Sequence, residues 1–181
     1  AIDKLKNIDI RIIAPSHGLV WREKPGDIIE LYRQWAELAG KPGEKGITLL
    51  YGSMYGNTEK MMNAVALGAS SAGLPVDIFD VARTDASYIM PSVWTRSGVI
   101  IGAPTYEVGL FPPMINALEL LALKKIENKM ALYFGSFGWS GGALKKVLSI
   151  TEPLKWSFAD TFEFQGGATE KDIEKGYELG K

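Results

Sequence analysis

A short stretch of small, hydroxyl and amide side chains, SMYGNT at residues 53–58, follows the strand-like run ITLLY at residues 47–51. The residues after it, 59–72, have the composition of a helix. A strand, a tight polar turn and a helix N-terminus form an anion site, because the first amides of a helix lack intrahelical acceptors and the helix dipole adds partial positive charge. The stretch therefore predicts a phosphate site, to which the serine, asparagine and threonine of the turn add donors.

The kind of phosphate follows from what the turn lacks. It has neither the Gly-Lys-Ser/Thr ending of a nucleotide-triphosphate loop nor the Gly-x-Gly-x-x-Gly pattern of a dinucleotide turn. It also has no Lys or Arg between Gly52 and Glu59. The pattern therefore predicts a monophosphate that is held by neutral donors.

From residue 47 onward, predicted strands alternate with predicted helices. The expected strands lie at residues 47–51, 76–81, 98–102, 130–134 and in a fifth run where Phe158, Phe162 and Phe164 share one face. The expected helices lie at residues 59–72, 112–123, 141–150 and 169–179, while residues 84–97 are expected to be irregular or weakly helical and broken by Pro91. This alternation predicts a three-layer α/β/α fold around a five-stranded parallel sheet of order 2-1-3-4-5.

Two further loops are unusual in composition. In such a sheet a ligand lies at the carboxyl ends of the strands, where the strand order reverses. The loop after the third strand reads APTYEVGLFPP, and the loop after the fourth reads GSFGWSGG. Both combine glycines, which let the backbone approach a ligand closely, with aromatic rings, which can stack on a flat group. The pair predicts a site for a heteroaromatic ring beside the phosphate site.

The three loops SMYGNT, APTYEVGLFPP and GSFGWSGGA resemble the FMN-contacting loops of flavodoxin-like domains. SFGWSGGA in particular is similar to the carboxyl-terminal flavodoxin domain of the flavodiiron proteins. The resemblance implies a flavodoxin-like fold with FMN as cofactor. It places at the cofactor Ser53, Met54, Tyr55, Gly56, Asn57, Thr58, Pro104, Thr105, Tyr106, Glu107, Gly109, Ser136, Phe137, Gly138, Trp139 and Gly141. Glu107 departs from the family, which more often has Asn or another neutral residue there.

The first residues resemble the end of a different domain. IIAPSHGLVWR is similar to the end of the metallo-β-lactamase-like domain that precedes the flavodoxin domain in flavodiiron proteins, where the His of this loop is a diiron ligand. The resemblance implies that His17 is a ligand in the full-length protein and that its partners lie outside this chain, which by itself has no metal site. The missing initiator Met and the abrupt start also indicate a fragment or a processed chain.

The expected divisions are a tail at residues 1–24, a connecting helix and linker at residues 25–46, and the FMN-binding domain at residues 47–181. The tail is expected to contain a strand at residues 8–13, and the connecting segment a helix at residues 25–39. A stripe of apolar residues at helical spacing predicts one face that packs against a domain surface; it consists of Ile28, Tyr32, Trp35 and Ala39.

The function that the resemblance implies is electron transfer. FMN would take electrons from a rubredoxin or from a flavin- or NADH-dependent reductase, and pass them to a diiron centre that reduces O2 or NO. The resemblance also implies a homodimer of the full-length protein, in which the flavin of one subunit serves the iron of the other. Because this chain has only the flavin half, we expect it to be yellow, free of iron, and without NO reductase activity or a catalytic residue of its own.

Two other functions are compatible with the same residues. A flavodoxin-like NAD(P)H:quinone oxidoreductase also carries SMYG, and rapid bleaching of the flavin by NADPH would indicate it. A non-enzymatic domain that binds another phosphate ligand would stay colourless. Single residues have structural alternatives as well: Trp139 could fill a surface gap, and Glu107 could be a solvated loop charge.

The composition narrows the class of protein. Net charge is −1 among 20 basic and 21 acidic residues, which argues against a nucleic-acid partner. No apolar run approaches the roughly 20 residues of a membrane span, and no signal peptide is recognisable. The chain has no cysteine, which excludes disulfides and Cys-ligated metal sites within it. These features fit a cytoplasmic location.

Overall fold

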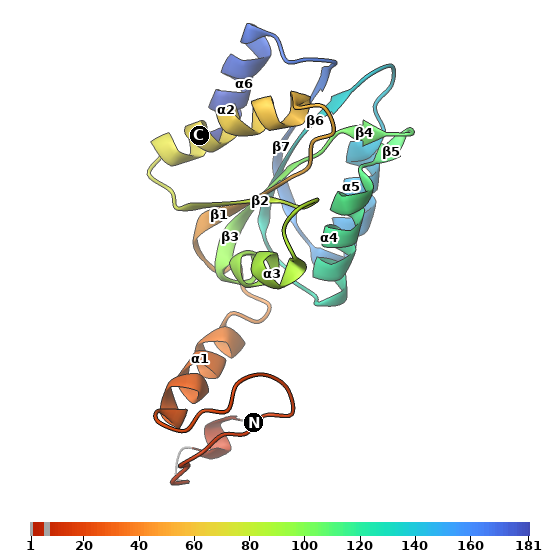
Figure 1. The fold of residues 1–181 in the computed structure, drawn as a ribbon. Helices are drawn as coiled ribbons and strands as arrows, with labels where there is room; N and C mark the ends of the chain where they lie inside the picture. The colour runs from red at the N-terminus through yellow and green to blue at the C-terminus, as the bar shows by residue number, and fades with distance from the viewer. Residues whose placement is uncertain (1, 6–7) are drawn as a thin grey trace. The chain divides into compact units, whose positions relative to one another are not determined.

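The structure is a computed structural model that describes residues 2–5 and 8–181. It divides into two compact units, Ala1–Lys41 and Pro42–Lys181 (Figure 1). The first unit contains the 3-10 helix η1 (Ile2–Leu5) and the helix α1 (Pro25–Glu37). All the other helices and strands belong to the second unit.

The strand expected at residues 8–13 does not form. Only Ile13 takes part in a bridge, and it pairs with Trp21 in an antiparallel sense. Their backbone groups exchange hydrogen bonds of 3.0 and 2.9 Å. The apolar run lacks a neighbouring strand over the rest of its length, and without a partner an extended segment cannot form a sheet.

Helix α1 begins at Pro25, as expected, and ends two residues earlier than expected, at Glu37. Proline at the first helical position loses no hydrogen bond, since that amide has no intrahelical acceptor. Tyr32 and Trp35 contact each other edge to face with ring centroids 5.7 Å apart. Both rings remain substantially exposed, and the helix buries none of its residues.

The second unit is built on a five-stranded parallel sheet of order β2-β1-β3-β6-β7. This order confirms the predicted fold class. The strands are β1 (Glu44–Tyr51), β2 (Val76–Asp80), β3 (Arg96–Gly102), β6 (Met130–Phe137) and β7 (Ser157–Gln165). The helices are α2 (Asn57–Ser71), α3 (Ala86–Thr95), α4 (Pro112–Leu123), α5 (Ala143–Thr151) and α6 (Glu170–Gly180). The short 3-10 helix η2 (Glu152–Leu154) follows α5.

Helices cover both faces of the sheet (Figure 1). One core lies between the sheet and α3, α4 and α5, and the other lies between the sheet and α2 and α6. The central strand β3 supplies both cores, because Val99 and Ile101 enter the first and Ile100 enters the second. This is why the predicted strand at residues 98–102 contains no polar side chain.

The predicted common face of the three phenylalanines is wrong. Phe162 and Phe164 lie in the core beneath α6, whereas Phe158 packs against the core on the opposite face. The cause is an irregularity in the pairing of β6 with β7, where Ala131 pairs with Phe158 but the next residue, Leu132, pairs with Asp160. A one-residue shift of register turns every later side chain to the other face.

The expected irregular segment at residues 84–97 is instead an ordered helix, α3, which continues through Pro91. Asp85 caps it by accepting a hydrogen bond of 2.9 Å from the amide of Ser87. Ile89 and Val93 are buried one turn apart on the same side of the helix. This burial and the cap outweigh the backbone hydrogen bond that a proline removes.

At the amino end of β6 a lysine is buried and forms no ion pair with any acidic residue that the structure describes. Lys129 is 2 % exposed, and its ammonium donates to the carbonyl oxygens of Pro42, Trp94 and Arg96 at 2.8, 3.1 and 2.7 Å. Burial lowers the pKa of Lys129 to about 8. This side chain fastens the start of the second unit to the strand that follows α3.

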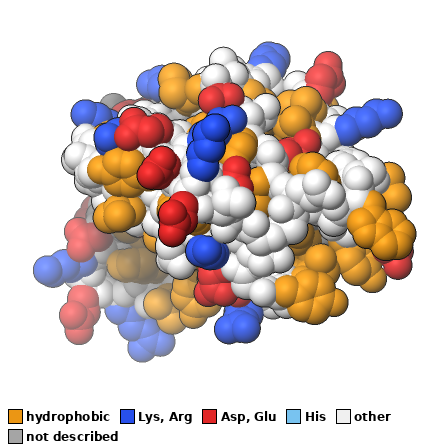
Figure 2. Space-filling model, turned by 90° about the horizontal axis from the view of Figure 1, so that it is seen from above, with side chains coloured by type: hydrophobic (Ala, Val, Ile, Leu, Met, Phe, Trp, Pro, Cys, Tyr) orange, Lys and Arg blue, Asp and Glu red, His pale blue; other side chains and the backbone are white. Residues whose placement is uncertain are grey.

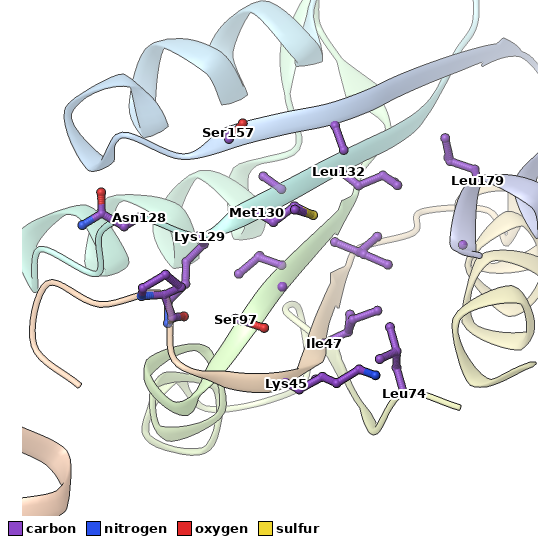
Figure 3. Close-up of a pocket in the computed structure, with 18 of the residues that line it drawn as sticks. Lys45, Ile47, Leu74, Ser97, Asn128, Lys129, Met130, Leu132, Ser157 and Leu179 are labelled. Atoms are coloured by element: carbon purple, nitrogen blue, oxygen red, sulfur yellow. Dashed lines mark hydrogen bonds between the residues drawn. The ribbon is translucent and has the colours of Figure 1, made fainter. Parts of the chain in front are cut away.

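Next to Lys129 lies a groove of about 870 Å³ at the amino ends of the strands. Figure 3 shows its apolar wall, which includes Ile47, Leu74 and Leu132, with Lys45 at its rim. The groove is therefore at the opposite edge of the sheet from the predicted phosphate and ring loops.

Figure 2, which views the molecule from above, shows acidic, basic and apolar side chains intermixed on that face, with no block of one charge sign. Within the described residues, no helix is both long enough and apolar enough to cross a bilayer.

Candidate functional site

Three loops emerge at one edge of the sheet. They follow β1, β3 and β6, which are neighbours in the parallel sheet and end at Tyr51, Gly102 and Phe137. Successive strands along the chain lie on either side of β1, so the strand order reverses between β1 and β3. This reversal is where ligands bind in open α/β sheets. The structure thus brings together the three loops that the sequence singled out.

The first loop presents unbonded amides at the start of α2. Gly56 is the N-cap residue in a left-handed conformation, with φ 86°, and no side chain caps the helix. The amide of Gly56 donates to Ser53 Oγ at 3.0 Å, and the first helical bond runs from the Lys60 amide to the Gly56 carbonyl at 2.9 Å. The amides of residues 57–59, all within the described chain, therefore have no acceptor. Donors arranged in this way suit a phosphate.

A pair of hydroxyl groups connects the first loop to the third. Thr58 Oγ1 and Ser136 Oγ lie 3.0 Å apart, and both residues are buried, with 1 % and 7 % of their surface exposed. Thr58 belongs to the first turn of α2, and Ser136 belongs to the end of β6. The structure therefore places the Thr58 hydroxyl beneath the loops, with Ser136 as its hydrogen-bond partner.

The second loop folds into a hairpin that the sequence did not predict. Strands β4 (Thr105–Tyr106) and β5 (Gly109–Leu110) pair in an antiparallel sense around Glu107 and Val108. These two residues have positive φ of 46° and 63°. A two-residue turn of this kind needs positive φ at both positions and normally carries Asn or Gly. A branched residue such as valine is strained there, and such strain concentrates at binding sites.

The second and third loops are packed directly on each other. A β-carbon at Gly142 would overlap the carbonyl oxygen of Val108, so only glycine allows this approach. The amide of Ala143 also donates to Thr105 Oγ1 at 3.3 Å. The second loop therefore lies against the start of α5, next to the third loop.

The third loop is anchored from β7 and leaves its own amides free. Gln165 Nε2 donates to the Gly138 carbonyl at 2.8 Å. Within this described segment, the amides of residues 138–142 donate to no protein acceptor. Free amides in an ordered loop are available to the carbonyl and nitrogen acceptors of a bound ring.

Aromatic side chains project from the loops. Tyr55 is 88 % and Trp139 is 100 % exposed, while Tyr106 is 41 % exposed. Large apolar groups at the rim of a site can cover the face of a flat ligand. Other residues predicted for the site lie in or next to the same loops: Met54, Asn57, Pro104, Gly109, Phe137 and Gly141.

One carboxyl group beneath the third loop was missed by sequence reasoning. Glu163 on β7 lies next to Gly141, where a β-carbon would be 3.3 Å from Glu163 Oε2. Its Oε1 is buried without a hydrogen-bond partner, and burial raises the pKa of the Glu163 carboxyl. The sequence feature that could have indicated Glu163 is its position between Phe162 and Phe164, two phenylalanines that are buried in the fold.

His17 lies in a bend of the first unit and is exposed. Among residues 2–5 and 8–181, no three His, Cys, Asp or Glu side chains come together as a possible metal site. The predicted role of His17 as a ligand in a longer protein remains a prediction.

An open parallel sheet with a phosphate-type turn after β1, and with glycine-rich, aromatic loops after β3 and β6, defines a flavodoxin-like α/β protein. The flavodoxin family model matches residues 49–180, so the chain belongs to the flavodoxin family. FMN is the cofactor of this family. The unbonded amides at the start of α2 fit its phosphate, and the glycine-rich, aromatic loops with free amides fit its ring.

The chain is similar to several known proteins and solved structures. The nitric oxide reductase of Moorella thermoacetica is 34% identical over 180 residues, which cover 97% of this chain and 44% of that protein. Among solved structures, the rubredoxin oxygen:oxidoreductase of Desulfovibrio gigas has a TM-score of 0.86 at 25% identity, covering 99% of this chain and 45% of that one. The flavodiiron protein of Giardia intestinalis has a TM-score of 0.81 at 27% identity, with 94% and 42% covered. The chain thus spans less than half the length of these proteins.

Proposed function

We propose that the chain is an FMN-binding electron-transfer domain. The observation that carries this proposal is the meeting of three loops at the strand-order reversal, with free amides in the first and third. When bound, FMN supplies the capacity to accept and release electrons, and the protein positions it and tunes it.

Each loop has a distinct task in this proposal. The amides of residues 57–59, with the hydroxyl groups of Ser53 and Thr58, hold the phosphate. The amides of residues 138–142 donate to polar atoms of the ring, and Trp139 and Tyr106 limit its contact with water. Thr58 and Ser136 fix the spacing between the phosphate subsite and the ring subsite, because their hydroxyl groups join the two loops.

The larger protein that we infer is a flavodiiron oxidoreductase. The similar proteins are named a nitric oxide reductase, a rubredoxin oxygen:oxidoreductase and a flavodiiron protein. By this comparison, electrons pass from a rubredoxin or a flavin- or NADH-dependent reductase through FMN to a diiron centre that reduces O2 or NO. The diiron centre belongs to a preceding metallo-β-lactamase-like domain, to which residues 1–24 and the ligand His17 belong, and the full-length protein is a homodimer.

The test of FMN binding is direct. The purified chain is mixed with FMN, freed of excess by gel filtration, and examined by absorption spectroscopy, with the released cofactor identified by mass spectrometry. We expect one FMN per chain, and we expect reduction by a rubredoxin that is itself held reduced. A colourless protein after this treatment would contradict the proposal. Rapid bleaching by NADPH alone would instead indicate the quinone oxidoreductase.

A further inference from the structure

Glu163 occupies a distinctive position at the carboxyl end of β7. Its strand partner is Gly135 of β6, the strand that leads into the third loop. Its carboxyl group lies against the α-carbon of Gly141 in the same loop. No ion pair of the described residues includes Glu163, and its Oε1 is buried and unpartnered. A partly buried carboxyl group with neither a cation nor a full set of donors is costly to ionise.

The neighbour of Glu163 is a tyrosine hydroxyl that bonds to the second loop. Tyr133 is fully buried on β6, and its hydroxyl donates to the carbonyl oxygen of Ala103 at 3.2 Å. Ala103 is itself fully buried and precedes Pro104, the first predicted cofactor residue of the second loop. The Tyr133 hydroxyl lies beside Gly135, where a β-carbon would overlap it, and Gly135 is the strand partner of Glu163. The Tyr133 and Glu163 side chains therefore lie next to each other on the same face of the sheet. A chain of polar groups therefore runs from the third loop to the second.

The protonation state of Glu163 decides how this chain is bonded. A tyrosine hydroxyl has one proton to donate but can also accept. A protonated Glu163 can donate to the Tyr133 oxygen while Tyr133 donates to the Ala103 carbonyl, so every group is satisfied. An ionised Glu163 can only accept, and it competes with the Ala103 carbonyl for the single Tyr133 proton. Losing that donor leaves a buried carbonyl without a partner, which is unfavourable.

We propose that Glu163 is a positioning residue of the FMN site. In its protonated form it donates to Tyr133 and so keeps the second and third loops in the arrangement that binds the flavin. This inference rests on the proposed FMN-binding function. It predicts that FMN affinity falls as the pH rises and Glu163 loses its proton.

The surroundings of Glu163 contain few other charges. Tyr133 is the titratable group that faces it from β6, and burial together with the nearby carboxylate raises the pKa of Tyr133, so its hydroxyl keeps its proton. The second and third loops present to it the backbone of Ala103 and Gly141, which have no charge. Lys145 and Lys146 of α5 are exposed and form no ion pair with Glu163. A pH effect that disappears with Glu163 is therefore assignable to it.

The experiment compares FMN dissociation constants of the wild-type chain and Glu163→Gln, measured by quenching of flavin fluorescence between about pH 5 and about pH 8.5. Glutamine keeps a permanent donor for Tyr133. The FMN phosphate also titrates in this pH range. We therefore compare the ratio of the wild-type to the variant dissociation constant at each pH, because the contribution of the phosphate cancels in this ratio. We expect similar affinities at the acidic end, and about fivefold weaker wild-type binding at the alkaline end, the equivalent of one hydrogen bond.

Two variants serve as controls. Asp160→Asn removes an exposed carboxylate from the same strand and should follow the wild-type profile. Tyr133→Phe removes the hydroxyl that links Glu163 to the Ala103 carbonyl, so it should bind FMN more weakly than the wild type at every pH. The ratio of its dissociation constant to that of the wild type should become smaller as the pH rises. A constant ratio between wild type and Glu163→Gln would overturn the role of Glu163 while leaving the FMN site intact. Failure of the wild-type chain to bind FMN at any pH would overturn both proposals.

Discussion

Thr58 and Ser136 are 78 positions apart in the chain, yet their hydroxyl oxygens lie 3.0 Å apart in the interior beneath the first and third loops. One hydroxyl donates to the other, which leaves the second proton free to reach another acceptor. Because the pair is buried, its geometry is set by the packing of α2 against β6 rather than by solvent. The distance between the phosphate subsite and the ring subsite is therefore a property of the core.

The hydroxyl groups of the first loop should matter for FMN and much less for riboflavin, which lacks the phosphate. We expect Ser53→Ala and Thr58→Ala each to weaken FMN binding by about 1.5–3 kcal/mol, the contribution of a hydrogen bond to a charged group. Fluorescence titration with both ligands measures the difference. Equal losses for FMN and riboflavin would mean that the loop does not hold the phosphate.

Trp139 is expected to shield the ring. Its side chain is fully exposed, so its removal costs the fold little, and thermal unfolding of Trp139→Ala should match the wild type. FMN affinity should fall, and the reduction potential should shift, because water then reaches the flavin and solvates its reduced anion. Affinity and potential are measured by titration and potentiometry. If neither changes, Trp139 is not part of the site.

The close packing of the second and third loops offers a steric test. Gly142→Ala introduces a β-carbon that overlaps the Val108 carbonyl, so the hairpin must move away from the start of α5. We expect at least about tenfold weaker FMN binding, since a displacement of this size removes a hydrogen bond or a stacking contact. Gly26→Ala in α1, outside the candidate site, is the control, because a β-carbon there would contact nothing within 4 Å. Equal affinities of the two variants would show that the hairpin does not help to bind FMN.

Much of this architecture is predictable from the sequence, because alternating apolar and amphipathic segments specify a parallel sheet and glycine-rich loops mark its functional edge. At the start of α6, Thr169 and Asp172 form reciprocal capping bonds, and their Thr-x-x-Asp spacing is readable in the sequence. Sequence periodicity failed where a local irregularity changed the register, as between Phe158 and Phe162 on β7. Periodicity assumes an uninterrupted strand, and nothing in the residue types marks the irregularity.

The other features that the sequence did not predict depend on contacts between segments that are far apart in the chain. Glu107 and Val108 are poor residues for a turn with positive φ, so local propensity argued against the hairpin that packing enforces. The proximity of Tyr133 to Glu163 depends on the pairing of β6 with β7, which a single sequence does not reveal. Tertiary packing overrides local preference at both places, and both adjoin the candidate site.

Lys129 provides a test of the fold that is independent of the cofactor. Its buried ammonium donates to three backbone carbonyl groups, so Lys129→Met should lower the free energy of unfolding at pH 7 by about 1–3 kcal/mol. Lys45→Met, at an exposed position of the same groove, should change it by less than about 0.5 kcal/mol. Denaturant unfolding monitored by circular dichroism measures both. If Lys45→Met lowers the free energy of unfolding as much as Lys129→Met does, the hydrogen bonds of Lys129 to the three carbonyl groups do not stabilise the fold.

The contribution of Lys129 to the free energy of unfolding should increase with pH. The pKa of Lys129 is lowered from 10.5 to about 8 in the folded chain, so between these values the unfolded state binds more protons than the folded state. Stability rises with pH wherever the unfolded state binds more protons. The free energy of unfolding of the wild type, relative to Lys129→Met, should therefore be level below about pH 8 and should rise by about 1–3 kcal/mol toward pH 10.5. Denaturant titrations of both proteins at several pH values measure this difference, in which the titration of other lysines and tyrosines cancels. A difference that stays constant above pH 8 would show that the three carbonyl groups hold the Lys129 proton as firmly as water does.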